Sequence, residues 1–256
     1  MEVINLKNIS GLPVSLDVRK PDLIFGGDFP FTEKTERSLD NLRPYLKNPK
    51  AIGPDPAYYM WRRVHLEKDD EKFTAAGLRY DLTLLAPGKI GNEFVKTAGH
   101  NHRPPYPEIY EVLYGRAYFL IQSYADNDCK SVQEVFLTEA GAGEKFAIPS
   151  GFGHNMVNIS DEPLLTANLV SDRVGHNYAP YNDNHGACYY ILNGRRAIEI
   201  EKNPNYRSVP DIKKIRIREY PEFGLAKKIP LYDLINAPDK IDFLSRPENN
   251  LDKLGW

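Results

Sequence analysis

Between about residue 57 and residue 172, short apolar segments rich in β-branched and aromatic residues are separated by Gly, Pro, Asn or Asp. Residues of these types are typical of strands. Many short strands at close spacing indicate an antiparallel sandwich or barrel, and the lack of alternating helical patterns argues against a parallel α/β sheet. We therefore expect a mainly all-β fold, with strands at 58–66, 78–86, 93–99, 108–115, 117–124, 132–138, 145–149, 155–160 and 164–170.

The N-terminal flank has a different pattern. Residues 1–30 contain several Pro and Gly breakers and are expected to be extended and rich in loops. Residues 33–46 are expected to form one helix, because leucines recur at helical spacing behind Thr32, a suitable N-cap residue. We assign residues 1–56 to an N-terminal extension with one helix.

The C-terminal flank mixes strand and helix signals. A hairpin turned at Asn193-Gly194 is expected within 189–200, followed by a strand at 213–220 and two short helical turns in 230–245. The polar stretch 246–256 is expected to lie on the surface or against a partner. We assign residues 57–182 to the barrel and residues 183–256 to a C-terminal extension that packs on it, all within one domain.

Composition excludes several classes of protein. The 256 residues carry 33 Lys and Arg against 35 Asp and Glu, a balance that argues against nucleic acid or an anionic membrane bound by bulk electrostatics. The sequence contains neither a membrane-spanning apolar run nor a signal-peptide pattern at its start. Cys129 and Cys188 are too few for a disulfide scaffold, so we expect reduced thiols and a cytoplasmic location.

One group of residues could bind a metal ion. His100 and His102 are two apart, so on a strand their imidazoles point to the same side, and a proline-rich turn leads from them to Glu108. His154 begins another expected strand. Each of these residues alone could be structural. Together, three imidazoles and one carboxylate suit Fe, Mn, Zn, Ni or Cu, and on an octahedral ion they would leave two adjacent positions open.

The spacing of these residues resembles the two cupin motifs. The first motif matches His100, His102, Glu108 and Gly115, with a gap before Glu108 that is slightly longer than the common pattern. The second motif matches the group Gly143, Pro149, Gly151, His154 and Asn158. The resemblance implies a cupin barrel, which is a double-stranded β-helix of the jelly-roll type, and a metal site at His100, His102, Glu108 and His154.

Residues 55–182 are similar to the cupin-type phosphoglucose isomerases, a group best known from archaea, through the segments LRYDLTLLAPG, EFVKTAGHNH, PEIYEVLYG, IPSGFGHNMVN and VGHNYAPY. The resemblance implies a metal-dependent isomerase that interconverts glucose 6-phosphate and fructose 6-phosphate through a metal-stabilised enediol. Its substrate residues carry over to Tyr59, Thr83, Thr97, Gly99, Tyr110, His176 and Tyr178.

The resemblance also assigns roles. Thr83, Thr97 and Gly99 would bind the phosphate, with Tyr59 a looser match, and such hydroxyls and amides need no nearby net positive charge. Tyr110 would face the sugar. His176 and Tyr178 would close over the substrate, and together with Glu108 they are the expected catalytic residues.

The expected cofactor is one divalent metal ion per chain, Fe²⁺ or Mn²⁺ before Zn²⁺ or Ni²⁺. The expected partners are a hexose 6-phosphate and, by analogy with related cupins, a second copy of the chain in a homodimer. Two alternative functions remain open. One is an iron-dependent cupin dioxygenase with the same ligands and an apolar pocket. The other is a non-catalytic cupin that binds a sugar phosphate.

Overall fold

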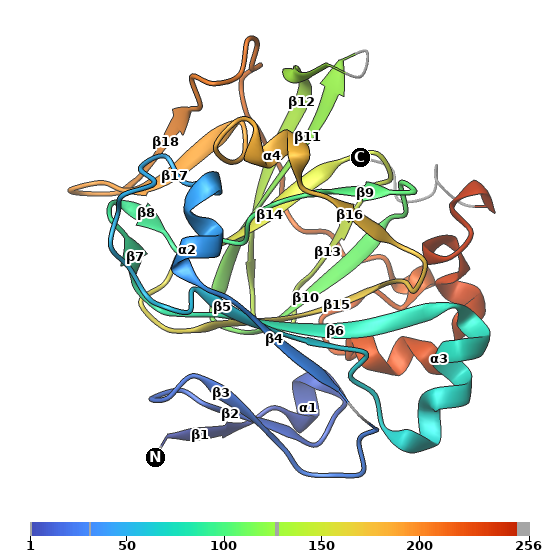
Figure 1. The fold of residues 1–256 in the computed structure, drawn as a ribbon. Coiled ribbons are helices and arrows are strands. Elements are labelled where there is room, and N and C mark those ends of the chain that lie inside the picture. Colours follow the sequence, from blue (N-terminus) through green and yellow to red (C-terminus); the bar gives the residue numbers. More distant parts are fainter. Residues whose placement is uncertain (1, 31, 126–127, 250–256) are drawn as a thin grey trace.

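The computed structural model describes residues 2–30, 32–125 and 128–249, and two sheets that face each other across a common core dominate it (Figure 1). The larger sheet has six antiparallel strands in the order β13-β10-β15-β6-β5-β4. In that order the strands span Lys145–Ile148, Glu108–Tyr114, Leu164–Ser171, Leu78–Leu85, Tyr58–Arg62 and Glu33–Arg37.

The opposing sheet has four strands in the order β14-β11-β12-β19. In that order they span Gly153–Asn158, Arg116–Ala125, Asp128–Gly141 and Lys213–Lys214. All pairs in this sheet are antiparallel except β12 with β19. The two sheets form the antiparallel barrel that the sequence predicts, so the expected all-β cupin fold is confirmed.

Three smaller sheets surround the barrel. The pair β16-β9 spans Gly175–Asn177 and Asn101–Arg103. The sheet β18-β17-β8-β7 spans Ile198–Lys202, Tyr189–Asn193, Glu93–Phe94 and Lys89–Ile90. The N-terminal sheet β1-β2-β3 spans Val3–Asn5, Val14–Asp17 and Asp22–Phe25.

The helices in the described ranges are short. The α-helices α1 to α4 span Lys7–Ser10, Leu39–Leu42, Asp70–Ala76 and Ala179–Asn182. The 3₁₀ turns span Arg43–Tyr45, Glu67–Asp69, Pro221–Phe223, Leu231–Asn236, Pro238–Lys240, Asp242–Leu244 and Pro247–Asn249. No helix in this described part of the chain is long and apolar enough to cross a membrane.

Both faces of the six-stranded sheet are covered, and β6 shows how its sequence achieves this. Tyr80, Leu82 and Leu84 belong to a hydrophobic core on the outer face, whereas Asp81 and Thr83 line a cavity inside the barrel. Successive side chains on a strand point to opposite faces, so one alternating segment serves both regions. The inner face therefore has room for polar chemistry while the outer face supplies stability.

The two chain extensions build the outer core. Leu12 and Leu16 from the N-terminal extension and Leu231 and Leu244 from the C-terminal turns are fully buried in it. In Figure 1 the N-terminal sheet (blue) lies below β4 to β6, and the C-terminal turns (red) lie beside α3. The extensions thus pack on the barrel. The expected boundaries between the segments remain an expectation.

The prediction of a single helix at 33–46 is wrong. Residues Glu33–Arg37 form β4, which pairs along the whole of β5, and α2 occupies only Leu39–Leu42. The helix begins after Ser38, whose hydroxyl accepts the Asn41 N–H at 3.2 Å, and not after Thr32. The helical leucine spacing is real but local. Before Ser38, backbone hydrogen bonds to the edge of β5 determine the structure.

Other expectations need smaller corrections. Residues 1–30 hold a three-stranded sheet as well as loops, and the strand expected at 93–99 ends at Phe94. The hairpin is present, but four residues connect Asn193 to Ile198, so the turn is wider than the expected Asn-Gly turn. The strand expected at 213–220 is limited to β19. The helical turns expected at 230–245 are present, and residues 250–256 of the expected surface stretch lie outside the described residues.

Candidate active site

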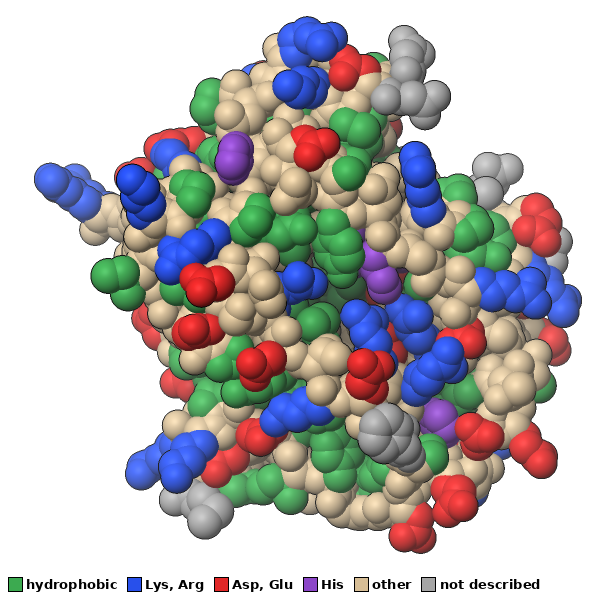
Figure 2. All heavy atoms as spheres, in the orientation of Figure 1, with side chains coloured by type: hydrophobic (Ala, Val, Ile, Leu, Met, Phe, Trp, Pro, Cys, Tyr) green, Lys and Arg blue, Asp and Glu red, His purple; other side chains and the backbone are tan. Residues whose placement is uncertain are grey.

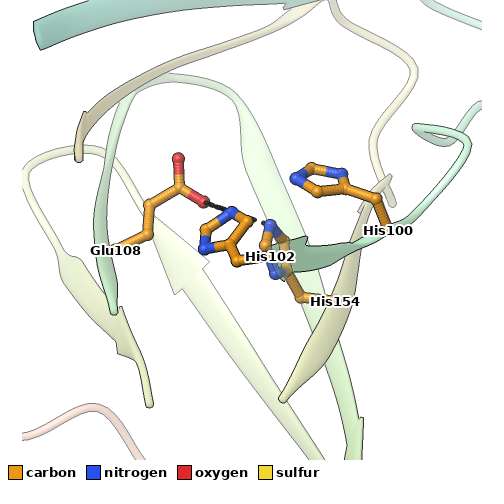
Figure 3. A group of neighbouring side chains, drawn as sticks. All are labelled: His100, His102, Glu108 and His154. Carbon is orange, nitrogen blue, oxygen red and sulfur yellow. Dashed lines mark ion pairs between the residues drawn. The ribbon is translucent and has the colours of Figure 1, made fainter. Parts of the chain in front are cut away.

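Four potential metal ligands meet inside the barrel although they come from separate elements. Glu108 begins β10 in the six-stranded sheet, His154 lies on β14 in the opposing sheet, and His102 lies on β9. His100 precedes β9 and exchanges backbone hydrogen bonds of 3.1 and 3.0 Å with His154. One donor atom from each residue lies within 4.8 Å of the others, and Figure 3 shows the side chains converging.

The donor atoms have the surroundings of metal ligands. His100 Nε2, His102 Nε2 and Glu108 Oε2 are buried and make no hydrogen bond to the described residues. His102 Nδ1 lies 2.7 Å from the Tyr106 carbonyl oxygen, which can only accept, so Nδ1 carries the proton and Nε2 is free to bind a cation. Buried polar atoms without partners are rare. A divalent cation fits these residues and would satisfy them.

The electrostatics of the group also suit a cation. Burial, together with the neighbouring His154 and His102, holds the pKa of His100 well below its usual value. Burial alone would raise the pKa of Glu108, but the neighbouring His102 and His154 outweigh it and hold that pKa well below normal. Burial also lowers the pKa of His154. Neutral imidazoles at His100 and His154 and an ionised carboxylate at Glu108 are the forms in which these side chains bind metals.

Figure 3 also shows how the Glu108 carboxylate is directed. Oε2 faces the imidazoles, 3.4 Å from His102 Nε2 and 3.2 Å from His154 Nε2. The second oxygen points away from them. One carboxylate can therefore face both the candidate metal position and the space beside it.

A cavity opens next to the four ligands, and Figure 2 shows a hollow near the centre of one face with a histidine and Lys or Arg side chains beside it. The residues that line this cavity are Tyr58, Met60, Arg62, Arg79, Asp81, Thr83, Thr97, Ala98, Gly99, His100, Glu108, Tyr110, His154, Met156, Asn168, His176 and Tyr178. The lining is rich in hydroxyl, amide and charged groups. It suits a polar ligand more closely than an apolar one.

The structure brings together six of the seven residues expected to contact substrate: Thr83, Thr97, Gly99, Tyr110, His176 and Tyr178. The exception is Tyr59, which packs near Trp61 under the Lys34 ammonium on the other face of β5. The neighbouring Tyr58 lines the cavity instead, and its hydroxyl accepts the Ala98 N–H at 3.3 Å. Since side chains alternate along a strand, a shift of one residue moves the expected tyrosine out of the site.

His176 lies directly beside the ligand group. Strand β16 places it opposite His102 on β9, and its ring centroid is 4.5 Å from that of His100. Burial lowers the pKa of His176 to about 4, so the imidazole is neutral near pH 7. A neutral imidazole in the cavity can both donate and accept a proton.

Gly99 has a packing requirement of its own. Its φ is +80°, and an added Cβ would lie 2.4 Å from the Tyr181 ring. The close approach of this backbone to Tyr181 therefore explains why the position is a glycine, whether or not its backbone also binds a ligand. The neighbouring Thr97 hydroxyl accepts the Met156 N–H at 3.0 Å, which fixes the rotamer that faces the cavity.

Sequence reasoning missed the charged residues of the cavity. Arg62, Arg79 and Asp81 lie on β5 and β6, and both guanidinium groups approach Asp81 Oδ2, at 3.6 Å from Arg62 and 2.9 Å from Arg79. The signal was available in the alternation of β6, since Arg79 and Asp81 share the face of Thr83. The cavity thus contains two cationic side chains in addition to the hydroxyl and amide groups that were expected to bind the phosphate.

Comparisons with known proteins identify the family of the chain. A family model described as glucose-6-phosphate isomerase matches residues 38–207, more than half of the chain. The glucose-6-phosphate isomerase of Thermococcus kodakarensis is 26% identical over 200 residues, which cover 76% of this chain and 97% of the relative. That of Pyrococcus furiosus is 26% identical over 181 residues, covering 68% and 89%.

Among solved structures, an oxalate decarboxylase of Bacillus subtilis is similar to part of the chain, with a TM-score of 0.33 and 19% identity. The match covers 48% of this chain and 27% of that protein. The family assignment depends on the sequence comparisons alone. By the extent of the family-model match, the chain belongs to the glucose-6-phosphate isomerase family.

Proposed function

We propose that this chain interconverts glucose 6-phosphate and fructose 6-phosphate and needs a divalent metal ion to do so. The observation that carries the proposal is the group His100, His102, Glu108 and His154, whose donor atoms lie within 4.8 Å of one another beside a polar cavity. The family membership and the names of the relatives support the same reaction.

Thr83, Thr97 and Gly99 all line the cavity and would bind the phosphate, and the Tyr58 hydroxyl, which lies beside Ala98, lines it too. Glu108 lines the same cavity and would face the other end of the substrate. An open-chain sugar held by its phosphate would extend its first two carbons toward Glu108, and holding it in this way lowers the entropic part of the barrier.

The four ligands would hold Fe²⁺ or Mn²⁺, with Zn²⁺ or Ni²⁺ as alternatives, because this donor set accepts all of these ions. When bound, such an ion supplies Lewis-acid polarisation of the substrate oxygens at C1 and C2. The chain supplies the proton transfer. The Glu108 oxygen that points away from the imidazoles would take a proton from one of these carbons and return it to the other through an enediol.

Two neighbouring side chains would contact the hydroxyl groups of the substrate. Burial and the Glu108 charge raise the pKa of Tyr110 well above normal, so its hydroxyl stays protonated and would donate a hydrogen bond. The Tyr110 hydroxyl lies 3.3 Å from His154 Nε2. The neutral imidazole of His176 would accept and return a hydroxyl proton during ring opening. Tyr178, which follows on the same segment, would cover the substrate.

The character of the lining separates this proposal from a cupin dioxygenase. A dioxygenase that acts on an aromatic or thiol substrate would need a largely apolar cavity, whereas Arg62, Arg79, Asp81 and Asn168 line this one. These groups favour a sugar phosphate. A non-catalytic binder would share the lining but would give no turnover.

A direct test is isomerase activity of the purified chain on fructose 6-phosphate, with mannose 6-phosphate as the substrate that differs at C2. In D₂O, a proton transfer introduces deuterium at C2 of the glucose 6-phosphate formed. Full retention of hydrogen would instead support a hydride shift between C1 and C2, and no turnover of the metal-loaded chain would contradict the proposal. A homodimer in the cytoplasm remains a prediction, which sedimentation and fractionation would check.

A further inference from the structure

Arg62 is a cavity cation that uses little of its hydrogen-bonding capacity on the residues that the structure describes. Its Nη1 lies 3.6 Å from Asp81 Oδ2, beyond normal hydrogen-bond length, and its Nη2 lies 3.9 Å from the weakly accepting Met60 sulfur. Its side chain is 29% exposed, so solvent or a ligand can reach it. A guanidinium in this state can bind an anion without first breaking a strong contact.

The neighbouring Arg79 differs in this respect. Arg79 Nε donates to Asp81 Oδ2 at 2.9 Å, and its side chain is 11% exposed. The other Asp81 oxygen accepts the Arg63 backbone N–H at 2.9 Å. The carboxylate is therefore already engaged by stronger partners, and the charge of Arg62 is only partly compensated.

The sheet register places Arg62 beside the expected phosphate contact. Strand β5 pairs with β6 so that Met60 lies opposite Thr83 and Trp61 opposite Leu82. Continuing this register by one residue brings Arg62 to Asp81, which agrees with the 3.6 Å between Arg62 Nη1 and Asp81 Oδ2. Arg62 is thus a diagonal neighbour of Thr83 on the same face of the sheet. Diagonal neighbours are about 7–8 Å apart at their backbones, within reach of a long side chain.

We propose that Arg62 binds the phosphate group of the substrate together with Thr83, and that this contact makes the enzyme select phosphorylated sugars over neutral ones. The inference rests on the proposed function, because it concerns how the same cavity recognises its substrate. A guanidinium can form two parallel hydrogen bonds to one phosphate and adds a positive charge, whereas a hydroxyl donates one hydrogen bond and carries no charge.

A second cation must be distinguished from Arg62. Arg37 on β4 has its guanidinium carbon 6.0 Å from the Tyr58 ring centroid and 5.5 Å from that of Tyr178, and both rings line the cavity. Arg37 itself does not line the cavity, so it would act only from behind these rings. The experiment therefore includes both arginines.

The test compares Arg62→Met, Arg62→Lys, Arg37→Met and Arg63→Met in the metal-loaded enzyme. Arg63 is the matched control, since it is adjacent in sequence, is 58% exposed and pairs with Asp172 at 2.7 Å outside the cavity. We expect Arg62→Met to raise the KM for fructose 6-phosphate about 10- to 100-fold with little change in kcat, and Arg62→Lys to recover part of this. Activity toward unphosphorylated fructose, however low, should not change, and neither should any constant of Arg63→Met.

A readout that needs no turnover accompanies the kinetics. Calorimetric titration with inorganic phosphate should detect binding to the parent chain and to Arg63→Met, and much weaker binding to Arg62→Met. Unchanged KM and phosphate binding in a folded Arg62→Met, or a loss found in Arg37→Met and not in Arg62→Met, would overturn the inference while leaving the isomerase proposal intact. If the parent enzyme does not turn over fructose 6-phosphate, the proposed function fails instead.

Discussion

Glu108 Oε2 lies 3.2 Å from His154 Nε2, although Glu108 belongs to the six-stranded sheet and His154 to the sheet that faces it. The candidate metal site therefore joins the two halves of the barrel. A ligand set held by separate strands keeps its geometry only while the packing between the sheets is preserved. Interactions away from the cavity, such as the attachment of the chain extensions, thus support the site indirectly.

One such interaction is a buried ion pair on the outer face of β10. Lys145 Nζ donates to Glu111 Oε1 at 2.7 Å and to the Ala226 carbonyl oxygen at 3.0 Å, and the Leu231 N–H donates to Glu111 Oε2 at 2.9 Å. Both side chains are almost fully buried. The pair therefore holds the C-terminal extension against the barrel.

We expect Lys145→Met to lower the free energy of unfolding by about 3–5 kcal/mol, because it leaves the Glu111 carboxylate buried without its partner. The double variant Glu111→Met with Lys145→Met should lose less than Lys145→Met alone. Lys213→Met breaks the exposed pair with Glu134 and should cost under about 1 kcal/mol. Urea denaturation of the four proteins checks this, and equal losses in the single and double variants would contradict it.

The same pair gives a pH dependence of known sign. Burial, only partly offset by Lys145, raises the pKa of Glu111 to about 7 from 4.5. Between these values the folded state binds more protons than the unfolded state, so the contribution of Glu111 to stability falls as pH rises from 4.5 through 7. The destabilisation by Lys145→Met should therefore be larger at pH 8 than at pH 5, and a loss that does not change with pH would contradict this.

The contribution of His176 to stability should depend on pH with the opposite sign. Burial lowers its pKa to about 4 from 6.5, so between these values the unfolded chain binds more protons than the folded chain. The stability that depends on neutral His176 is complete above pH 6.5 and is lost as pH falls toward 4. We expect the stability of the chain in excess chelator to fall less steeply over this range in His176→Asn. His185→Asn, at an exposed position, is the control and should retain the parent slope.

Alanine substitutions at two glycines distinguish the cost of backbone strain from the cost of tight packing. Gly99 and Gly151 have φ values of +80° and +83°, but an added Cβ meets the Tyr181 ring at 2.4 Å only at Gly99 and meets nothing within 4 Å at Gly151. Gly151→Ala should cost about 1–2 kcal/mol from the left-handed backbone alone. Gly99→Ala should cost about 1–3 kcal/mol more through overpacking. Thermal unfolding measures both, and equal losses would contradict the close approach to Tyr181.

Much of the fold follows from the sequence, because the residue types that favour strands and the breakers between them are local properties. The segments of β6, β10, β11 and β15 are rich in such residues, and the structure has these strands close to their expected positions. Glu33–Arg37 could not be assigned in the same way, since its residues suit a helix and only pairing with β5, distant in the sequence, makes it a strand. In this segment the tertiary contact with β5 overrides the local preference for a helix.

The site shows the same division. The spacing of the His and Glu residues is specific enough to find all four ligands, which the structure brings together. The position of a single residue on a strand is not specific enough, so Tyr59 was expected in the cavity where Tyr58 lies. The cavity positions of Arg62 and Arg79 were not predicted. For Arg79 the alternation of β6 was sufficient once Thr83 was placed in the cavity. For Tyr58 and Arg62 on β5 the inward face follows from the register with β6, which a single sequence does not contain.

The most direct test of the account measures bound metal and isomerase activity on the same samples. The parent chain should contain about one divalent ion, lose its fructose 6-phosphate isomerase activity after removal of that ion by chelator and dialysis, and regain it on addition of Fe²⁺ or Mn²⁺. His154→Ala should neither bind the ion tightly nor recover. Full activity in a chain shown by elemental analysis to be free of metal, or tight metal binding that persists in His154→Ala, would contradict the assignment of the four ligands.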